Sequence, residues 1–261
     1  MSLGKTHWGE SEIRGPVHLF RERLMLRLFC PLLSGGRVLD AGCGSGSLAF
    51  DLSQLGYKVN MVEYSPEFVE SVADRTRMNS KSGWTRVQRA SVTQLPFLDS
   101  SFDGIVCGEV LEHVLPEDGG DLAAIGQFAR VLRPGGIIVA SVPLNPCLWD
   151  ISDEWALHVK RYVREEFLNL FSENGFEVRS VRVWGFPLGR LYHRYIFKPW
   201  LNRVRKQTVV QRENRCDTRL GRSRILVNSA ANLFRFDEMF SHLPWGRGVV
   251  VAAQRVVEKR R

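Results

Sequence analysis

Short apolar runs alternate with amphipathic segments along most of the chain. Six runs rich in valine and isoleucine, each bounded by glycine, proline or polar residues, predict β-strands at residues 37–42, 58–64, 85–91, 102–109, 136–143 and 176–185. A seventh run, residues 246–257, follows a long break. Alternation of strands and helices predicts an α/β fold with a mostly parallel, doubly wound sheet.

The amphipathic segments between these strands predict helices with clear end signals. The segment 65–78 opens with Ser65, a favoured N-cap residue, and continues with Pro66 and acidic side chains near the positive end of the helix. The segment 121–136 ends with proline and paired glycines directly before the fifth strand. Residues 17–29 predict a further helix ahead of the first strand.

The first predicted strand runs directly into a glycine-rich turn, "LDAGCGSG" at residues 39–46. Gly42, Gly44 and Gly46 let the backbone approach a ligand at the carboxyl end of the strand, where this topology favours binding. The third glycine comes one position earlier than in the dinucleotide fingerprint, and Asp40 would repel a pyrophosphate but attract a cation. The turn therefore predicts a nucleotide-like cofactor that carries positive charge.

This stretch resembles the first motif of class I S-adenosylmethionine-dependent methyltransferases, whose cofactor has an ammonium and a sulfonium and no phosphate. Residues 90–114 resemble the third and fourth segments of the same family, and residues 130–143 resemble its fifth. The similarity covers about residues 37–185. It implies a Rossmann-like, doubly wound seven-stranded sheet with the last strand antiparallel, and S-adenosylmethionine as the cofactor.

The resemblance also implies which residues surround the cofactor. Glu63, about 20 residues after the turn, fits the acidic residue that accepts hydrogen bonds from both ribose hydroxyls. Tyr64 would line the adenine, and Ser91 stands where the family commonly has an aspartate that holds the adenine amino group. An arginine of the leading helix would bind the cofactor carboxylate. The expected set is Arg21, Arg23, Asp40, Gly42, Cys43, Gly44, Gly46, Glu63, Tyr64, Ser91, Val92, Gly108 and Glu109.

The exit of the fourth strand indicates the class of acceptor. Family members that methylate exocyclic amines of nucleic-acid bases usually carry Asn or Asp, then Pro-Pro and an aromatic residue there. This chain has "CGEVLEHV" at residues 107–114, which resembles ubiquinone-biosynthesis O-methyltransferases and related small-molecule methyltransferases. A hydroxyl acceptor must lose its proton, so His113 and His158 are the candidate catalytic bases. We predict methyl transfer to a small-molecule or lipid-like acceptor, with oxygen as the favoured atom.

The net charge of +8 is concentrated between Arg190 and Arg224. There, residues 186–206 interleave aromatic and basic side chains, which is typical of a helix that covers a hydrophobic substrate or lies on an anionic membrane. The basic segment also keeps an RNA methyltransferase open, although the absent Pro-Pro motif opposes nucleic acid as a partner. A nicotinamide-dependent oxidoreductase and a non-catalytic cofactor-binding module are the alternatives outside this class.

The chain of 261 residues divides into three expected regions: a helical cap (1–35), the cofactor-binding core (36–185 and 246–261) and a helical insertion before the last strand (186–245). Five scattered cysteines without a C-x-x-C pair indicate neither disulfides nor a zinc site, so no metal is expected. The N-terminus lacks the apolar region of a signal peptide, which predicts a cytoplasmic protein. The sequence leaves the acceptor and the oligomeric state open.

Overall fold

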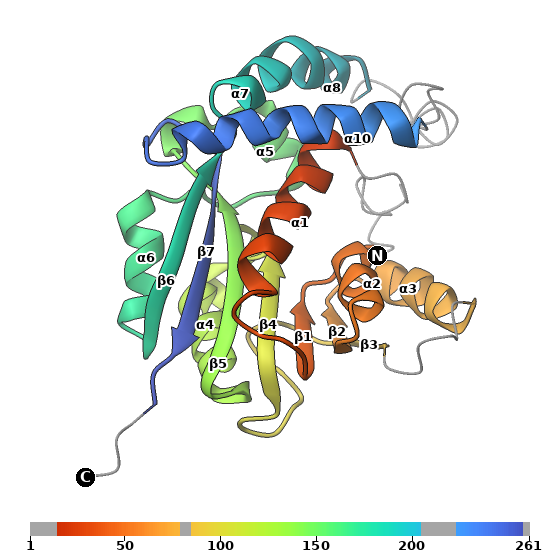
Figure 1. The fold of residues 1–261 in the computed structure, drawn as a ribbon, viewed down its shortest axis with the longest axis vertical. Coiled ribbons are helices and arrows are strands. Elements are labelled where there is room, and N and C mark those ends of the chain that lie inside the picture. Colours follow the sequence, from red (N-terminus) through yellow and green to blue (C-terminus); the bar gives the residue numbers. More distant parts are fainter. Residues whose placement is uncertain (1–14, 79–84, 205–222, 258–261) are drawn as a thin grey trace.

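A computed structural model describes residues 15–78, 85–204 and 223–257. Its strands form one seven-stranded sheet in the order β3-β2-β1-β4-β5-β7-β6 (Figure 1). The strand β7 runs antiparallel to β5 and β6, and the other pairings are parallel, as the sequence predicts. The strands are β1 (Arg37–Ala41), β2 (Lys58–Glu63), β3 (Arg86–Arg89), β4 (Phe102–Gly108), β5 (Leu132–Pro143), β6 (Phe176–Trp184) and β7 (Gly248–Arg255).

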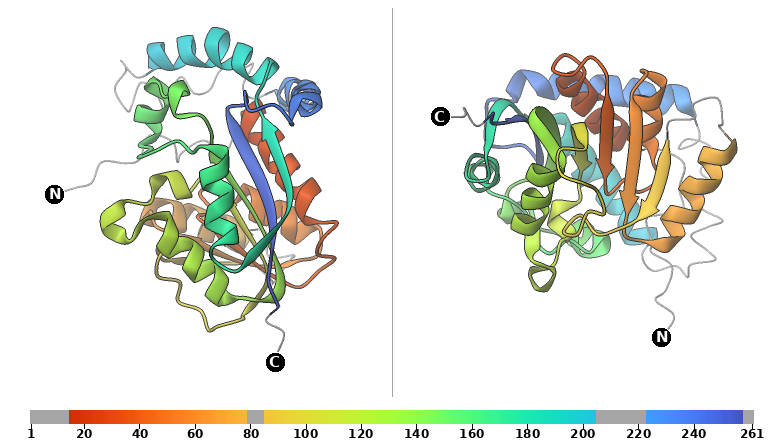
Figure 2. Two further views of the ribbon diagram at one scale, coloured as in Figure 1. Left: turned by 90° about the vertical axis from the view of Figure 1, so that its left-hand side faces the viewer. Right: turned by 90° about the horizontal axis from the view of Figure 1, so that it is seen from below.

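Helices cover both faces of the sheet (Figures 1 and 2). Alternate strand residues point to opposite faces, so Leu39 and Ile105 pack toward α4 and α6, whereas Val38 and Val106 pack toward α1 and α2. Both layers are buried cores, which explains the continuous apolar runs of the central strands. The flanking helices are α1 (Pro16–Phe29), α2 (Ser47–Gln54), α3 (Pro66–Met78), α4 (Gly120–Val131) and α6 (Arg164–Ser172).

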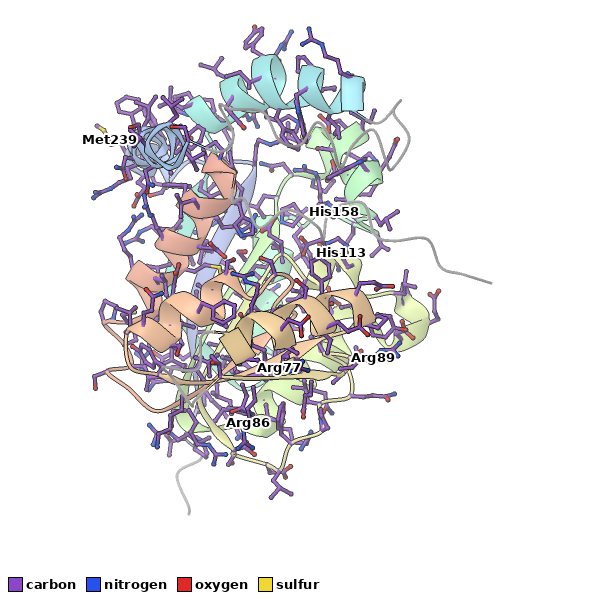
Figure 3. The ribbon with its side chains drawn as sticks, turned by 90° about the vertical axis from the view of Figure 1, so that its right-hand side faces the viewer. Arg77, Arg86, Arg89, His113, His158 and Met239 are labelled. Atoms are coloured by element: carbon purple, nitrogen blue, oxygen red, sulfur yellow. The ribbon has the colours of Figure 1, made fainter. Side chains whose placement is uncertain are left out.

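The sheet differs from the sequence expectation at two places. Strand β5 begins at Leu132, four residues before the predicted start, and its pairing with β4 shifts register between Phe102 and Gly104. Pro134 lies in this irregular stretch. Proline has no amide proton to donate to the hydrogen-bond ladder of a regular sheet, so it favours such an irregularity. Strand β3 is shorter than predicted and forms a sheet edge whose arginines, labelled in Figure 3, are exposed. Such charge on an edge strand discourages pairing with other chains.

The described part of the insertion covers the carboxyl ends of the parallel strands, with α5 beneath it (Figure 1). Within it, α7 (Leu188–Tyr192), the π-helical turn η4 (His193–Phe197) and α8 (Lys198–Val204) follow one another without a break. Pro199 has no amide proton for the carbonyl four residues earlier, which favours the wider π turn just before it. The remaining elements are η1 (Leu111–His113), η2 (Pro116–Asp118), η3 (Pro146–Leu148), α5 (Ile151–Ala156), α10 (Arg224–Leu233) and η5 (Phe234–Phe240).

Parts of the expected regions lie outside the described residues. These are residues 1–14 of the cap, 205–222 of the basic insertion and 258–261 after the last strand. Among the helices that the structure describes, none combines the length and apolarity needed to cross a bilayer.

Candidate active site

The glycine turn after β1 forms the floor of the expected cofactor site. Gly42, Gly44 and Gly46 all have left-handed backbone angles, with φ of 77°, 51° and 75°. A Cβ at Gly42 would lie 2.4 Å from a methyl of Val110, so a side chain there would collide with the protein itself. A Cβ at Gly44 would meet nothing within 4 Å, so the space above that residue is open to a ligand.

Glu63 is fixed at the end of β2 directly beside this turn. Its Oε2 accepts a hydrogen bond from the Gly44 amide at 2.9 Å, and its Oε1 accepts from the amides of Tyr64 (2.7 Å) and Ser65 (3.0 Å). An ionised carboxylate has about four acceptor positions, so one remains for a ribose hydroxyl. The Tyr64 side chain is exposed, with the Arg89 guanidinium 5.9 Å from its ring.

A buried carboxylate lies under the turn, where the resemblance implies a cationic cofactor. Asp40 is 2% exposed, and its Oδ2 has no hydrogen-bond partner among the described residues. Burial and the nearby charges of Glu22 and Glu63 raise the pKa of Asp40 to about 8. A bound ammonium or sulfonium would offset this cost, so the orphaned oxygen and the open space above Gly44 fit S-adenosylmethionine.

Glu22 on α1 is a site residue that the sequence analysis missed. It is 4% exposed, accepts a hydrogen bond from the Ser47 hydroxyl and lies 3.0 Å from His18 Nε2. These contacts tie the cap helix to the start of α2, beside the glycine turn. The only local signal was the spacing of His18 and Glu22, four residues apart on one helix face.

The two arginines predicted on the cap helix point in different directions. Arg21 Nη1 lies 3.6 Å from Glu109 Oε2 at the end of β4. Arg23 instead donates to Asn232 Oδ1 at 3.1 Å and to Asn228, both on α10. Residues two positions apart on an α-helix are rotated by about 200° around its axis, so the side chains of Arg21 and Arg23 leave opposite faces. Of the two alternatives, Arg21 faces the strand ends and Arg23 faces α10, so Arg21 stays the candidate to bind the cofactor carboxylate.

The remaining predicted cofactor residues gather at the ends of β3 and β4. Glu109 has a left-handed backbone (φ 56°), and its Oε1 accepts from the Ser141 hydroxyl at 3.0 Å. The Ser91 hydroxyl pairs with the Thr93 hydroxyl at 2.8 Å, next to the buried Val92. Cys43 is buried in the turn, and Gly108 packs close to Met25 of the cap helix.

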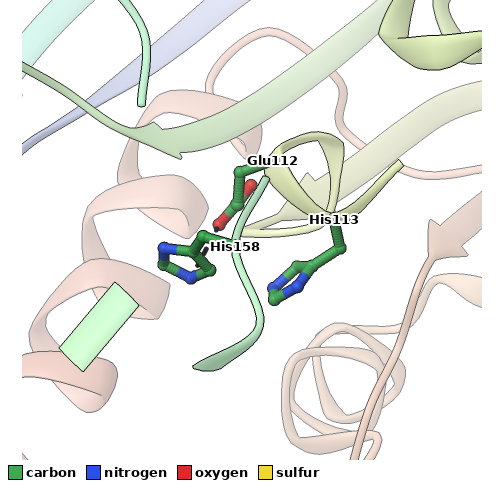
Figure 4. A group of neighbouring side chains, drawn as sticks. All are labelled: Glu112, His113 and His158. Atoms are coloured by element: carbon green, nitrogen blue, oxygen red, sulfur yellow. Dashed lines mark ion pairs between the residues drawn. The ribbon is translucent and has the colours of Figure 1, made fainter. Parts of the chain in front are cut away.

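The two predicted histidines come together beyond the end of β4, although they are far apart in sequence. The rings of His113 and His158 meet edge to face with centroids 4.8 Å apart (Figure 4). His158 Nε2 lies 3.8 Å from Glu112 Oε1, and His113 Nδ1 lies 3.3 Å from the Leu157 carbonyl. Figure 3 shows both histidines on the side of the sheet end that carries α5 and α8.

A buried carboxylate orients His158. Asp153 Oδ1 accepts from His158 Nδ1 at 2.9 Å and from Arg161 Nε at 2.7 Å. Burial alone would raise the pKa of Asp153, but these hydrogen bonds hold that pKa below its usual value. Because Nδ1 faces a carboxylate, the neutral His158 ring carries its proton there, which leaves the Nε2 lone pair available.

The other members of the cluster have strongly shifted pKa values. Burial and the neighbouring charge of Glu109 raise the pKa of Glu112 well above its usual value, and neither of its oxygens is hydrogen-bonded within the described structure. Burial and the charge of His158 lower the pKa of His113 to about 4. His113 is thus neutral near neutral pH, and the burial of Glu112 favours its protonated form.

The same cluster has the donor set of a cation site. Glu112, His113 and His158 each offer one ligand atom, and these atoms lie within 4.8 Å of one another. A carboxylate with two imidazoles suits zinc and other first-row divalent cations. The cysteine pattern predicted no metal, and no local pattern indicates this group, because Glu112 and His158 are brought together only by the fold.

Comparisons with known proteins identify the family of this chain. Residues 39–140 match the family model described as a methyltransferase domain. The ubiquinone biosynthesis O-methyltransferase of Xanthomonas oryzae pv. oryzae is 31% identical over 218 residues, which cover 78% of this chain and 84% of that protein. That of Xanthomonas campestris pv. campestris is 39% identical over 142 residues, covering 54% and 57%.

Solved structures share the fold. Geranyl diphosphate methyltransferase in complex with SAM has a TM-score of 0.59 at 20% identity, covering 92% of this chain and 86% of that one. Phosphoethanolamine N-methyltransferase 2 of Haemonchus contortus, in complex with S-adenosyl-L-methionine, has a TM-score of 0.63 at 18% identity, covering 97% and 56%. With the glycine turn, Asp40 and Glu63 in place, the chain belongs to the class I S-adenosylmethionine-dependent methyltransferases.

Proposed function

We propose that the enzyme transfers the methyl group of S-adenosylmethionine to a hydroxyl oxygen of a small-molecule or lipid-like acceptor. The observation that carries this proposal is the pairing of His113 and His158 just beyond Glu109, at the end of β4. The relatives named O-methyltransferases support oxygen as the methylated atom.

The chemistry sets what the protein must supply. The cofactor provides a methyl group on a sulfonium, and the thioether leaves neutral, so no general acid is needed. A hydroxyl acceptor becomes a good nucleophile only as it loses its proton, and catalysis then depends on alignment and on a base within hydrogen-bond reach. The base must be unprotonated at the working pH.

His158 is the better base of the pair. Asp153 holds its Nδ1 proton and leaves Nε2 as acceptor, which is the arrangement of an oriented catalytic histidine. His113, with its pKa lowered to about 4, is a weak base, because proton acceptors work best with pKa values near the working pH. His113 then packs against His158 and restricts its orientation.

The helix made of α7, η4 and α8 is proposed to cover the acceptor. His193 Nε2 and Lys198 Nζ lie 2.9 Å and 3.3 Å from Asp150 Oδ2, which ties this helix to α5 and hence to the loop that carries His158. Tyr195 and Ile196 are exposed on its outer side, beside basic residues. That face supports contact with an anionic membrane if the acceptor is a lipid.

One observation favours a second role for the same cluster. Both oxygens of the buried Glu112 lack a hydrogen bond among the described residues, and a divalent cation ligated by Glu112, His113 and His158 would satisfy them. A cation there would lower the pKa of a bound acceptor hydroxyl, and no histidine base would then be required. Chelation separates the two roles.

The test of the proposed function is a transfer assay with labelled S-adenosylmethionine. Catechol, an aliphatic alcohol and a primary amine of similar size serve as acceptors for the parent enzyme and for His158→Gln. Methylation of a hydroxyl that His158→Gln abolishes supports the proposal. Methylation of the amine alone would contradict it.

A further inference from the structure

Two arginines, one on the covering helix formed by α7, η4 and α8 and one just before β7, lack a negative partner. Arg247 immediately precedes β7, and Arg190 lies on α7. Among the described residues, no carboxylate lies within ion-pair distance of either guanidinium, and neither side chain makes a hydrogen bond. The Nε of Arg190 is buried without a partner. Charged groups are rarely left in this state, since burial without compensation is costly.

The backbone holds Arg247 firmly in this position. Its amide donates to the Trp184 carbonyl at 2.8 Å, and its carbonyl accepts from the Leu144 amide at 2.8 Å. The start of its side chain lies against Gly185, where an added Cβ would be 3.1 Å from Arg247 Cβ. Gly185 has a left-handed backbone (φ 88°), so the turn makes room for the arginine. Arg190 packs over the Phe186 ring, 5.6 Å from its centroid.

The two carboxylates whose charges act on Arg247 already pair with other cations. Asp153 pairs with Arg161 at 2.7 Å, and Asp150 pairs with Lys198 at 3.3 Å. The charges that act on Arg247 are therefore two carboxylates and two further arginines, Arg161 and Arg190. Burial and the repulsion from Arg161 lower the pKa of Arg247 to about 10. An additional anion would relieve this repulsion.

Hydrogen bonds also connect the main chain of Arg247 to the proposed base. Asp153 Oδ1 accepts from both His158 and Arg161, and Arg161 Nη1 in turn donates to the carbonyls of Leu144 (2.9 Å) and Arg247 (3.4 Å). A continuous set of hydrogen bonds thus runs from His158 to the main-chain carbonyl of Arg247. The residues that orient His158 therefore also hold the main chain from which the Arg247 side chain extends.

We propose that Arg190 and Arg247 form a subsite for an oxyanion, a carboxylate or phosphate group on the methyl acceptor. Guanidinium groups bind such anions through paired, charge-assisted hydrogen bonds, and both arginines have these donors available. As a statement about the acceptor, this inference rests on the proposed function. The subsite selects acceptors that carry an anionic group at some distance from the methylated hydroxyl.

The subsite is tested by calorimetry on the protein saturated with S-adenosylhomocysteine, a measurement that needs no methyl transfer. The probes are benzoate, inorganic phosphate, dihexanoyl phosphatidic acid and, as a neutral control, benzyl alcohol. We expect at least one anion to bind, and Arg247→Gln and Arg190→Gln each to weaken it about tenfold or more. Arg182→Gln, which changes an exposed arginine of β6, should leave the affinity unchanged.

The outcomes separate the possible sources of the anion. Binding of the phosphatidic acid alone places the anion on a lipid headgroup, and binding of benzoate or phosphate places it on a free small molecule. No binding of any anion, or equal affinity in the parent, Arg247→Gln and Arg190→Gln, would overturn the subsite. If Arg247→Gln fails to fold, the anion affinity of Arg190→Gln alone tests the subsite. A failed transfer assay with intact anion binding would overturn the proposed function but not the subsite.

Discussion

The amide of Gly44 donates a hydrogen bond to Glu63 Oε2 over 2.9 Å, which joins the glycine turn after β1 to the end of β2. The bond links the open space above Gly44 to the carboxylate expected to bind the ribose. A single contact thus connects the two motifs that the sequence placed about 20 residues apart.

Replacing Gly44 by valine should weaken S-adenosylhomocysteine binding at least tenfold, because the side chain would fill the open space. Valine in a left-handed conformation also costs about 1–2 kcal/mol of stability. Gly175→Val is the matched control, since Gly175 is left-handed and equally uncrowded but lies before β6. Calorimetry and thermal unfolding should show similar destabilisation in both variants and lost affinity only in the first. Equal affinity in both would contradict the site.

Glu63→Gln should weaken binding of the same ligand by roughly 1.5–3 kcal/mol, because the charged acceptor of a ribose hydroxyl is lost. If Glu63 binds the ribose, the variant should also lose its ability to distinguish ligands with and without a ribose hydroxyl. Parent protein should bind the 2′-deoxy analogue of S-adenosylhomocysteine more weakly than the ligand itself, whereas Glu63→Gln should discriminate much less between the two. Full discrimination in the variant would assign Glu63 a purely structural role.

Asp40 makes cofactor binding dependent on pH. With its pKa near 8, the carboxyl group is protonated at lower pH, so affinity for the cationic cofactor should fall as pH drops below about 8. Asp40→Asn should bind weakly and show much less of this dependence. Calorimetric titrations with S-adenosylmethionine at several pH values below about 8 compare the affinity of the parent with that of Asp40→Asn.

The same shift affects stability of the cofactor-free protein. The native state keeps the Asp40 proton up to about pH 8, whereas the unfolded chain loses it near pH 3.8, so its contribution to stability declines as pH rises between these values. Asp40→Asn lacks that contribution. The difference in Tm between variant and parent should therefore shift in favour of the variant as pH rises, and a constant difference would refute the shifted pKa.

His158→Gln should lower kcat by about a hundredfold to ten-thousandfold while S-adenosylhomocysteine binding is retained. His242→Gln, an exposed histidine, provides the control. His113→Gln should have a smaller effect. An acid limb of the pH–rate profile near pH 4, together with a dominant loss in His113→Gln, would assign the base to His113 instead.

Dialysis against EDTA should leave the transfer rate unchanged if His158 acts as the base. Glu112→Gln should then retain most of the activity as well. A loss of activity that Mg²⁺ or Zn²⁺ restores, and that Glu112→Gln reproduces, would assign the cluster to a divalent cation.

Local sequence patterns were sufficient for the sheet and for the glycine turn. Alternating apolar runs, the spacing of Gly42, Gly44 and Gly46, and the position of Glu63 all depend on neighbours close in sequence or on a regular topology. The structure confirmed the seven strands and the antiparallel β7. It corrected the start of β5, because a register shift cannot be recognised from composition.

Contacts between distant segments could not be predicted in the same way. Glu22 reaches Ser47 across 25 positions, and the ring of His158 meets that of His113 only because the fold brings their two segments together. Arg21 and Arg23 were equivalent in sequence, and only the packing of α1 against α10 separated them. Buried charge is set by tertiary structure, so shifted pKa values at Asp40 and Glu112 have no local signature.

The identity of the atom that receives the methyl group decides whether this enzyme is an O-methyltransferase. The enzyme is incubated with S-adenosylmethionine labelled in its methyl carbon and with 3,4-dihydroxybenzoate, which combines hydroxyl groups with the carboxylate expected at Arg190 and Arg247, or with catechol or the amine. The NMR chemical shift of the labelled methyl group then shows whether it is bonded to oxygen, nitrogen or carbon. We expect a methyl ether whose formation depends on His158. A labelled N-methyl or C-methyl product, with no methyl ether, would exclude a hydroxyl oxygen as the methylated atom.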